Sequence, residues 1–219
     1  MISRVTRSKA QAAASYNRLS RWYDRIAGST ERKYRELGLQ LLQAEEGESI
    51  LEIGFGTGHC LLALAKAVGP QGKVCGIDIS AGMRKIALRR LQSAGVADWV
   101  DLQVGDAVQL PFEHGIFDAV FMSFTLELFD TPEIPLVLEQ CRQVLRPGGR
   151  IGLVAMGRPE HPGFAVRLYE WCHTRWPAMV DCRPIHTREA LQEAGFTIEI
   201  VKQLMMWGLP VDVIQARKL

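Results

Sequence analysis

Short apolar runs alternate with helix-forming stretches through the middle of the chain. Residues 49–53 (SILEI) form an apolar run that stops at a glycine cluster, and residues 60–68 (CLLALAKAV) then carry apolar side chains through a full helical stretch. After a Gly-Pro-Gln-Gly turn, residues 73–79 predict a second strand and residues 81–94 a second helix. This order predicts a β-α-β unit.

The same alternation continues towards the C-terminus. Strands are predicted over residues 99–104, 117–123 and 150–156, and a helix over 135–145 ends at an Arg-Pro-Gly-Gly turn. Strands that are continuous apolar runs between helices are typical of a mainly parallel sheet with both faces covered.

The two ends of the chain depart from this alternation. Helices are predicted over residues 7–19 and 34–43, before the first strand. After the fifth strand, residues 157–186 are rich in proline and aromatic residues and predict a lid, which a capped helix over 187–194 follows.

Two strands close the chain. Residues 197–204 and 211–216, separated by a turn with Gly208 and Pro210, predict a terminal antiparallel hairpin. The predicted fold class is therefore α/β, a Rossmann-like doubly wound, mainly parallel seven-stranded sheet in a single domain. Its predicted parts are an N-terminal helical cap (1–45), a cofactor-binding core (46–156), a lid (157–186) and a C-terminal helix and hairpin (187–219).

Charge is distributed unevenly along the chain. The composition, 47% hydrophobic and 23% charged, is that of an ordinary globular protein, and the net charge of +2 does not suggest a surface that coats nucleic acid. The first 35 residues nevertheless carry nine basic side chains against Asp24 and Glu31, a local charge of +7 that leaves −5 for the rest. We therefore expect a basic N-terminal segment on a mildly acidic body.

The sequence favours a cytoplasmic protein. No apolar run approaches the roughly 18 residues of a membrane span, and the N-terminus lacks the apolar stretch of a signal peptide. The five cysteines include no C-x-x-C pair, which predicts reduced thiols and neither a disulfide framework nor a zinc cage. The histidines His161, His173 and His186 form no H-x-x-x-H pair, so no metal site is expected.

The strongest chemical signal is the glycine loop of residues 52–58 (EIGFGTG), where the first strand meets its helix. Glycines there permit a tight turn and let a ligand approach the backbone. A dinucleotide site needs G-x-G-x-x-G or a final alanine. Counted from Gly54 the sixth residue is His59, and counted from Gly56 it is Leu61, which argues against a dinucleotide.

Two acids follow the next strands. Asp78 ends the second predicted strand and suits the two hydroxyls of a ribose, and Asp106 follows the third. Each acid alone could instead be a helix cap or turn former. Together they lie along one edge of the predicted sheet, which favours a nucleoside-containing ligand.

With Glu52, the three glycines, Asp78 and Asp106, the chain resembles class I S-adenosylmethionine-dependent methyltransferases. The branch it resembles includes ubiquinone and menaquinone biosynthesis methyltransferases and some bacterial phosphatidylethanolamine N-methyltransferases. The resemblance runs from about Tyr16 to the terminal hairpin and implies S-adenosylmethionine as cofactor. The implied cofactor contacts are Tyr16, Tyr23, Glu52, Gly54, Phe55, Gly56, Gly58, Asp78, Ile79, Met83, Asp106, Ala107 and Ser123.

The resemblance also implies separate roles. The glycine loop would hold the methionine part of the cofactor, Asp78 the ribose, Ile79 and Met83 the faces of the adenine, and Asp106 with Ala107 its amino edge. A tyrosine-containing N-terminal segment, here 16–24, closes over the cofactor in this branch. The alternative for that segment is the simple packing of a helix on the sheet.

Methyl transfer from a sulfonium needs mainly a nucleophile that is held close and aligned, so a dedicated base is optional. If the acceptor first loses a proton, Tyr23, Glu127 or His173 could take it, and we predict Tyr23 and Glu127 as the catalytic pair. Arg183 could bind a phosphate or carboxylate of the substrate or could simply form a turn. The predicted substrate contacts are Trp22, Phe124, Tyr169, His173 and Arg183.

Three acceptor classes fit the sequence: a quinone-like ring, a phospholipid head group or a soluble metabolite. The aromatic lid favours an oily acceptor. Its apolar residues are Phe164, Leu168, Tyr169, Trp171, Trp176 and Met179. The basic N-terminus resembles an element that binds an anionic membrane surface, and a solvated basic helix is the open alternative.

Two further classes are less favoured. A non-catalytic binding protein would have no physical need for the full set of loop glycines and acids. Nucleic acid is not expected as a substrate, because Ser123-Phe124-Thr125-Leu126 stands where such methyltransferases carry N-P-P-[FYW]. The sequence indicates no oligomeric state.

Overall fold

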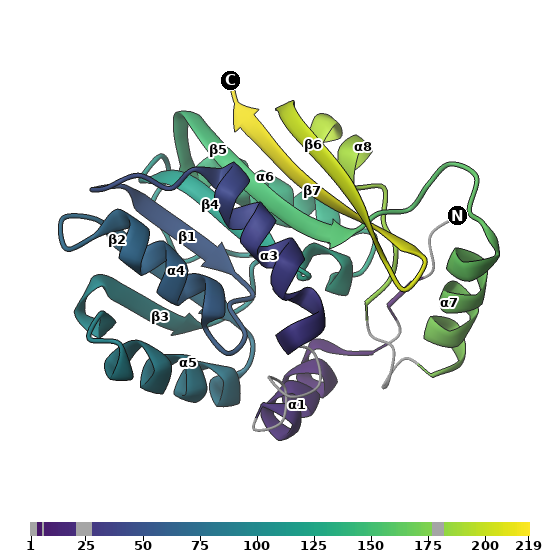
Figure 1. Cartoon of the computed structure of the whole chain (residues 1–219), viewed down its shortest axis with the longest axis horizontal. Coiled ribbons are helices and arrows are strands. Elements are labelled where there is room, and N and C mark those ends of the chain that lie inside the picture. Colours follow the sequence, from purple (N-terminus) through teal and green to yellow (C-terminus); the bar gives the residue numbers. More distant parts are fainter. Residues whose placement is uncertain (1–3, 6, 21–27, 177–181) are drawn as a thin grey trace.

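A seven-stranded sheet forms the centre of the computed structural model, which describes residues 4–5, 7–20, 28–176 and 182–219 (Figure 1). The strands are β1 (Ser49–Ile53), β2 (Lys73–Asp78), β3 (Val100–Val104), β4 (Phe117–Ser123), β5 (Leu145–Met156), β6 (Phe196–Met206) and β7 (Leu209–Lys218). They lie in the order β3-β2-β1-β4-β5-β7-β6, and only the pairs that include β7 are antiparallel. The predicted sheet with its terminal antiparallel hairpin is confirmed.

Helices cover both faces of the sheet. They are α1 (Lys9–Leu19), α3 (Gly28–Leu42), α4 (His59–Val68), α5 (Ala81–Ser93), α6 (Ile134–Val144), α7 (Phe164–Arg175) and α8 (Thr187–Glu193), with short 3₁₀ turns η1 (Ala97–Trp99) and η2 (Leu126–Leu128). One apolar core lies between the sheet and α3, α4 and α5, and a second lies between the sheet and α6 and α8. In β1, Ile50 enters the first core and Leu51 the second, because successive side chains of a strand point to opposite faces.

The position of each strand explains its sequence. β4 lies next to β1 and β5 near the middle of the sheet, and all its residues except Ser123 are buried. Such a strand needs apolar residues on both faces, which is why it is a continuous apolar run. Its last residue, Ser123, emerges at the carboxyl edge of the sheet.

The lid is more regular than its proline and aromatic content predicts. It contains the helix α7, and both its ends are fixed at the end of β5. Gly157 forms a bridge with Ile185, Arg158 N donates to Ile185 O at 2.8 Å, and Ile185 N donates to Met156 O at 2.9 Å. The lid therefore leaves the sheet and returns to it at the same place, the end of β5.

Two helix starts differ from the sequence prediction. α3 begins at Gly28, before the expected residue 34. The prediction of a capped α8 is wrong, because His186 at its N-cap position makes no side-chain cap hydrogen bond. The hydroxyl of Thr187 instead donates to Asp212 on β7 at 2.5 Å, which attaches the helix to the sheet.

A tight turn of Trp207 and Gly208 joins β6 to β7. Both residues have a positive φ, 53° and 80°, as in the turns whose twist matches a two-residue hairpin. The hydroxyl of Tyr34 on α3 donates to Met205 O at 2.6 Å, which fixes the tip of the hairpin. Within the part of the chain that the structure describes, no helix has the length and apolar character of a membrane span.

Candidate active site

A cavity of about 510 Å³ lies at the carboxyl ends of the central strands. The ends of β1, β2 and β4 and the loop after β3 form the floor of the cavity. Helix α1 and the residues before this helix cover the cavity. Of the predicted site residues, these line the cavity: Tyr16, Gly54, Gly56, Asp78, Ile79, Met83, Asp106, Ala107, Ser123, Phe124 and His173. Parallel strands end along one edge of the sheet, so residues far apart in the sequence meet there.

The three glycines of the loop serve different purposes. Gly54 and Gly58 have φ of 72° and 83°, and a Cβ at Gly54 would overlap the side chain of Thr125, while one at Gly58 would lie 2.8 Å from Ala87 Cβ. Gly56 also has a positive φ, 51°, but a Cβ there would meet nothing within 4 Å. The first and third glycines are required by packing, and the second leaves space for a ligand.

Asp78 connects the glycine loop to α5. Its carboxylate accepts from Gly56 N at 2.9 Å and from Ser80 N at 2.8 Å. Burial raises the pKa of Asp78, and these two backbone hydrogen bonds oppose that rise. Because Asp78 also borders the cavity, it presents a fixed acceptor to a ligand that lies against the loop.

Glu52 lies behind the cavity. It is buried, and its Oε2 has no hydrogen-bond partner among the described residues. Burial, and secondarily the charge of Asp78, raises the pKa of Glu52 well above its ordinary value. Phe55 and Gly58 likewise do not line the cavity.

The N-terminal helix is held over the cavity by polar contacts. Lys9 Nζ lies 2.5 Å from Asp106 Oδ2 and 2.6 Å from Glu133 Oε1. At the other end of α1, Asn17 Oδ1 accepts from Ser80 Oγ at 2.7 Å and from Gly82 N at 2.8 Å. Helix α1 thus lies over the cavity, while residues 21–24 of the predicted closing segment 16–24 lie outside the described residues.

The residues before α1 extend this cover. Arg4 donates from Nε and Nη2 to both carboxylate oxygens of Asp130, and Val5 N donates to the same group at 3.0 Å. The guanidinium of Arg4 holds the pKa of Asp130 at about 2. The Arg7 guanidinium lies 5.7 Å from the centre of the Tyr16 ring, which lines the cavity. Trp22 and Tyr23 lie outside the described residues.

Part of the cavity lining is apolar. Phe124, Leu128 and Phe129 line it, and His173 reaches it from the inner side of α7. Phe124 has φ of 51°, and its ring meets Tyr34 edge-on with centroids 6.2 Å apart. Since His173 is itself buried, α7 closes this side.

Two predicted site residues lie behind the cavity wall. Glu127 is fully buried, and burial raises its pKa to about 8. Its Oε1 accepts from Met156 N at 3.1 Å, and its Oε2 has no hydrogen-bond partner among the described residues. Arg183 is also fully buried and donates from Nη2 to Phe129 O at 2.6 Å. Both support the wall from behind. Neither of them lines the cavity, and Tyr169 does not line it either, so their predicted direct roles have no cavity contact behind them.

Several residues of the site have no signal in the sequence. Lys9, Asn17, Asp130 and Glu133 border or brace the cavity through partners distant in the chain. The Ser8 capping box marks the start of α1 but does not indicate where that helix docks. No cluster of three or more metal-ligating side chains occurs among the described residues.

Relatives of known name support a family assignment. A model of the family described as "Methyltransferase domain" matches residues 50–149. The chain is 36% identical over 155 residues to the 2-phytyl-1,4-naphtoquinone methyltransferase of Synechococcus elongatus, an alignment that covers 69% of this chain and 63% of the relative. It is 34% identical over 206 residues to the demethylmenaquinone methyltransferase of Symbiobacterium thermophilum, covering 83% of this chain and 80% of the relative.

Solved structures share the fold. The cyclase SpnF has a TM-score of 0.76 at 19% identity and covers 97% of both chains. Geranyl diphosphate methyltransferase, in complex with GPP and sinefungin, has a TM-score of 0.72 at 19% identity, covering 86% of this chain and 78% of its own. The open glycine and the fixed acid of the cavity fit S-adenosylmethionine, the cofactor of the family. The chain belongs to the class I S-adenosylmethionine-dependent methyltransferases and resembles their quinone-biosynthesis branch.

Proposed function

We propose that this protein transfers the methyl group of S-adenosylmethionine to an oily, quinone-like acceptor. The observation that carries the proposal is one cavity with two different halves. Gly56 and Asp78 lie at one side of it, and Phe124, Leu128 and Phe129 lie at the other. The named relatives act, by their names, on a naphthoquinone and on demethylmenaquinone, which supports the same acceptor class.

The cofactor, when bound, supplies an electrophilic methyl group. Gly56 would let it approach the backbone of the loop, and Asp78 would accept from its ribose hydroxyls. Asp106 would face the adenine only if its contact with Lys9 opens or shifts. Ile79, Met83 and Ala107 border the same part of the cavity and would pack on the base.

The acceptor would be held by packing. Phe124 and Phe129 exclude water from their side of the cavity, and alignment of a nucleophile near the methyl group supplies much of the rate. His173 would take a proton from an acceptor that has one to lose. Glu127 acts, in this proposal, as a positioning residue that holds the backbone of Met156.

We also propose that the protein meets this acceptor at an anionic membrane surface. The sequence assigned that contact to the basic N-terminus. In the structure, however, Arg4 and Lys9 are paired with acids of the cavity rim, so these two charges brace the cavity cover. Contact through the other basic residues of the N-terminus stays a prediction, and the lid helix offers a second surface for it.

The test is methyl transfer from labelled S-adenosylmethionine to a total lipid extract and, in parallel, to a soluble metabolite extract. We expect label in the lipid fraction, in a band that appears when a demethylated quinol is added and co-migrates with the methylated quinol. Label confined to the soluble fraction would replace the quinone-like acceptor by a soluble metabolite. Binding of S-adenosylhomocysteine without label in either fraction would favour a cofactor-binding protein without this activity.

A further inference from the structure

The lid helix α7 carries its large apolar side chains on the side that faces solvent. Phe164, Leu168 and Trp171 recur at helical spacing and are 82%, 47% and 57% exposed. The opposite side is the packed one, where Val166 and His173 are buried. A surface helix ordinarily shows the reverse arrangement, with its apolar stripe towards the core.

The tip of the β6–β7 hairpin adds a further exposed ring next to α7. Trp207 is 72% exposed, and a Cβ at the adjacent Gly208 would lie 3.6 Å from Ala165 Cβ on α7. Figure 1 shows the tip beside this helix. The φ of Trp207, 53°, is rare for a bulky residue, and asparagine or glycine would fill the turn with less strain. Because local geometry does not favour tryptophan here, we infer a role for its exposed ring.

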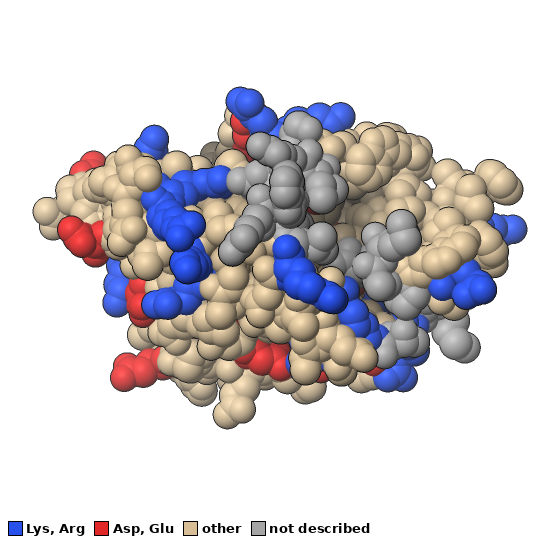
Figure 2. Space-filling model, turned by 90° about the horizontal axis from the view of Figure 1, so that it is seen from below, with Lys and Arg blue, Asp and Glu red and all other residues tan. Residues whose placement is uncertain are grey.

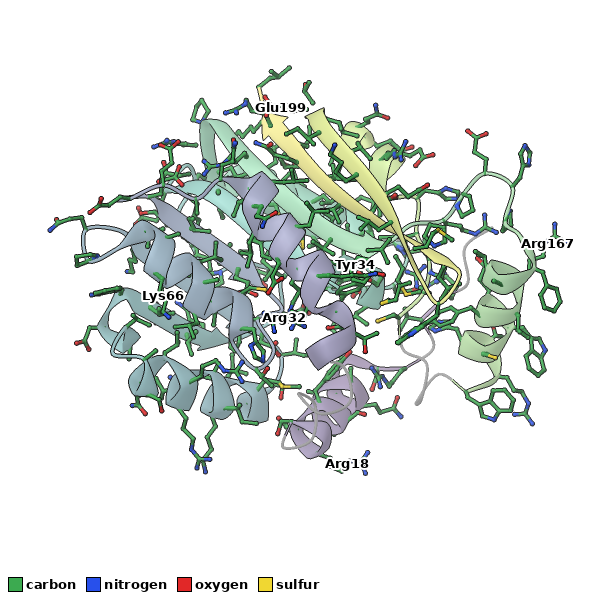
Figure 3. The ribbon with its side chains drawn as sticks, in the orientation of Figure 1. Arg18, Arg32, Tyr34, Lys66, Arg167 and Glu199 are labelled. Atoms are coloured by element: carbon green, nitrogen blue, oxygen red, sulfur yellow. The ribbon has the colours of Figure 1, made fainter. Side chains whose placement is uncertain are left out.

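Cationic side chains accompany these rings. Arg167 and Arg175 are exposed on α7, and Figure 3 shows Arg167 directed away from the body of the molecule. The Arg175 guanidinium lies 5.9 Å from the centre of the Trp176 ring. The single acidic residue of α7, Glu170, instead accepts from Arg158 Nε at 2.7 Å. The outer side of the helix is therefore aromatic and cationic.

The same character is visible on the molecular surface. In Figure 2, the right-hand end, which holds α7, shows Lys and Arg side chains set among uncharged surface. Asp and Glu side chains gather towards the left and lower margins of this view. An anionic, partly apolar surface would complement the right-hand end.

The residues that carry this character form the α7 face: Phe164, Leu168, Trp171, Trp207, Arg167 and Arg175. We propose that the α7 face docks in the headgroup region of an anionic bilayer. Aromatic rings favour that layer of a membrane, where their apolar bodies leave water, and arginines nearby meet anionic headgroups. A helix can lie in this layer without crossing the bilayer.

This docking surface rests on the proposed function and explains how an oily acceptor would reach the cavity. His173, on the inner side of α7, lines the cavity, while Trp171, on the outer side, would touch the membrane. The helix would then be the partition between bilayer and active site. The acceptor would pass along it without crossing water.

A second copy of the chain is the less favoured occupant. A symmetric contact between two α7 faces would bring each pair of arginines towards the same pair on the partner. Because Glu170 is already engaged by Arg158, α7 offers no carboxylate to neutralise them. Anionic lipid supplies the missing negative charge.

The first experiment compares vesicle binding by the full chain and two double variants. The face variant is Phe164→Glu with Trp171→Glu. The matched control is Ile116→Glu with Leu136→Glu, which changes two exposed apolar residues outside the α7 face. We expect the parent and the control to co-sediment with phosphatidylcholine vesicles that contain phosphatidylglycerol, and the face variant to bind them about tenfold more weakly or worse. Salt should release the parent.

The second readout separates docking from catalysis. Calorimetry with S-adenosylhomocysteine should give the same affinity for parent and face variant, which shows that the variant folds. Methyl transfer to a short-chain quinol in solution should also be unchanged, whereas transfer to a long-chain quinol in vesicles should fall with the loss of binding. If the parent methylates no quinol but still needs the face to bind vesicles, the proposed function fails and the docking surface stands.

Two results would overturn the docking surface. In the first, the parent fails to sediment with phosphatidylglycerol vesicles. In the second, the face variant sediments as the parent does. If the parent is then also a dimer that the face variant turns into a monomer, the face belongs to a second copy of the chain.

Discussion

Asn17 and Ser80 join the N-terminal helix to the start of α5. Asn17 Oδ1 accepts from the hydroxyl of Ser80 at 2.7 Å, and Ser80 N donates to Asp78 at 2.8 Å. A continuous set of hydrogen bonds therefore runs from the cover of the cavity to the acid on its floor. Ser80 therefore links the cover of the cavity to the acid on its floor.

Replacement of Asn17 by alanine should loosen the cover. The variant loses the hydrogen bonds to Ser80 Oγ and Gly82 N, each of which contributes about 1 kcal/mol. We expect S-adenosylhomocysteine to bind roughly 5- to 30-fold more weakly, mainly through faster dissociation. Stopped-flow fluorescence and calorimetry measure both quantities. Arg18→Ala, an exposed change on the same helix, is the control, and equal dissociation rates in the two variants would contradict the linkage.

A side chain at Gly56 should block the cofactor without unfolding the protein. Gly56→Ala places a Cβ in open space beside the loop, with the strain of a positive φ. Gly47 has the same two properties, a positive φ and open space, but it lies in the turn before β1. We expect similar small losses of thermal stability in Gly56→Ala and Gly47→Ala, and loss of cofactor binding only in the first. Normal binding by both variants would move the ligand away from Gly56.

Asp78→Ala should weaken cofactor binding by about 1.5–3 kcal/mol, roughly 10- to 150-fold in Kd. Because Asp78 also accepts from the backbone of Gly56 and Ser80, a modest fall in the melting temperature should accompany the change. Asp101→Ala on β3 removes an exposed carboxylate that accepts from Gln103 Nε2 and should leave Kd unaltered. A parent-like Kd for Asp78→Ala would refute its contact with the ribose.

Stability should depend on pH through Glu127. Its pKa is about 8 in the fold against an ordinary 4.5, so between these values the folded state holds a proton that the unfolded state has lost. The free energy of unfolding therefore falls as pH rises through this range. Arg183 opposes the raised pKa and Glu31 adds to it.

The amide of Glu127→Gln does not titrate in this pH range, and its oxygen still accepts from Met156 N. Its melting temperature should match that of the parent near pH 5 and exceed it by on the order of 5 °C near pH 8. Thermal melts of both proteins across this pH range measure the difference. Parallel curves for the two proteins would mean that Glu127 is ionised in the fold.

The sequence by itself determined the fold and part of the cavity floor. Periods of two and 3.6 residues depend on local backbone geometry, so the strands, the helices and the terminal hairpin can be predicted from them. Gly56 lies in the loop after β1 and Asp78 is the last residue of β2, so both are predicted at the carboxyl edge of a parallel sheet. Both line the cavity.

Only the tertiary structure decided which polar groups meet across the chain. Arg4 finds Asp130 and Lys9 finds Asp106 and Glu133 through the docking of α1, and no periodicity encodes such a contact. Glu127, predicted as a catalytic residue, and Arg183, predicted at the substrate, are fully buried and do not line the cavity. The lid aromatics have the composition of a core, yet Phe164 and Trp171 face outward. Composition records only that a side chain is apolar, whereas the packing of α7 on Val166 and His173 sets which side of the helix meets the protein.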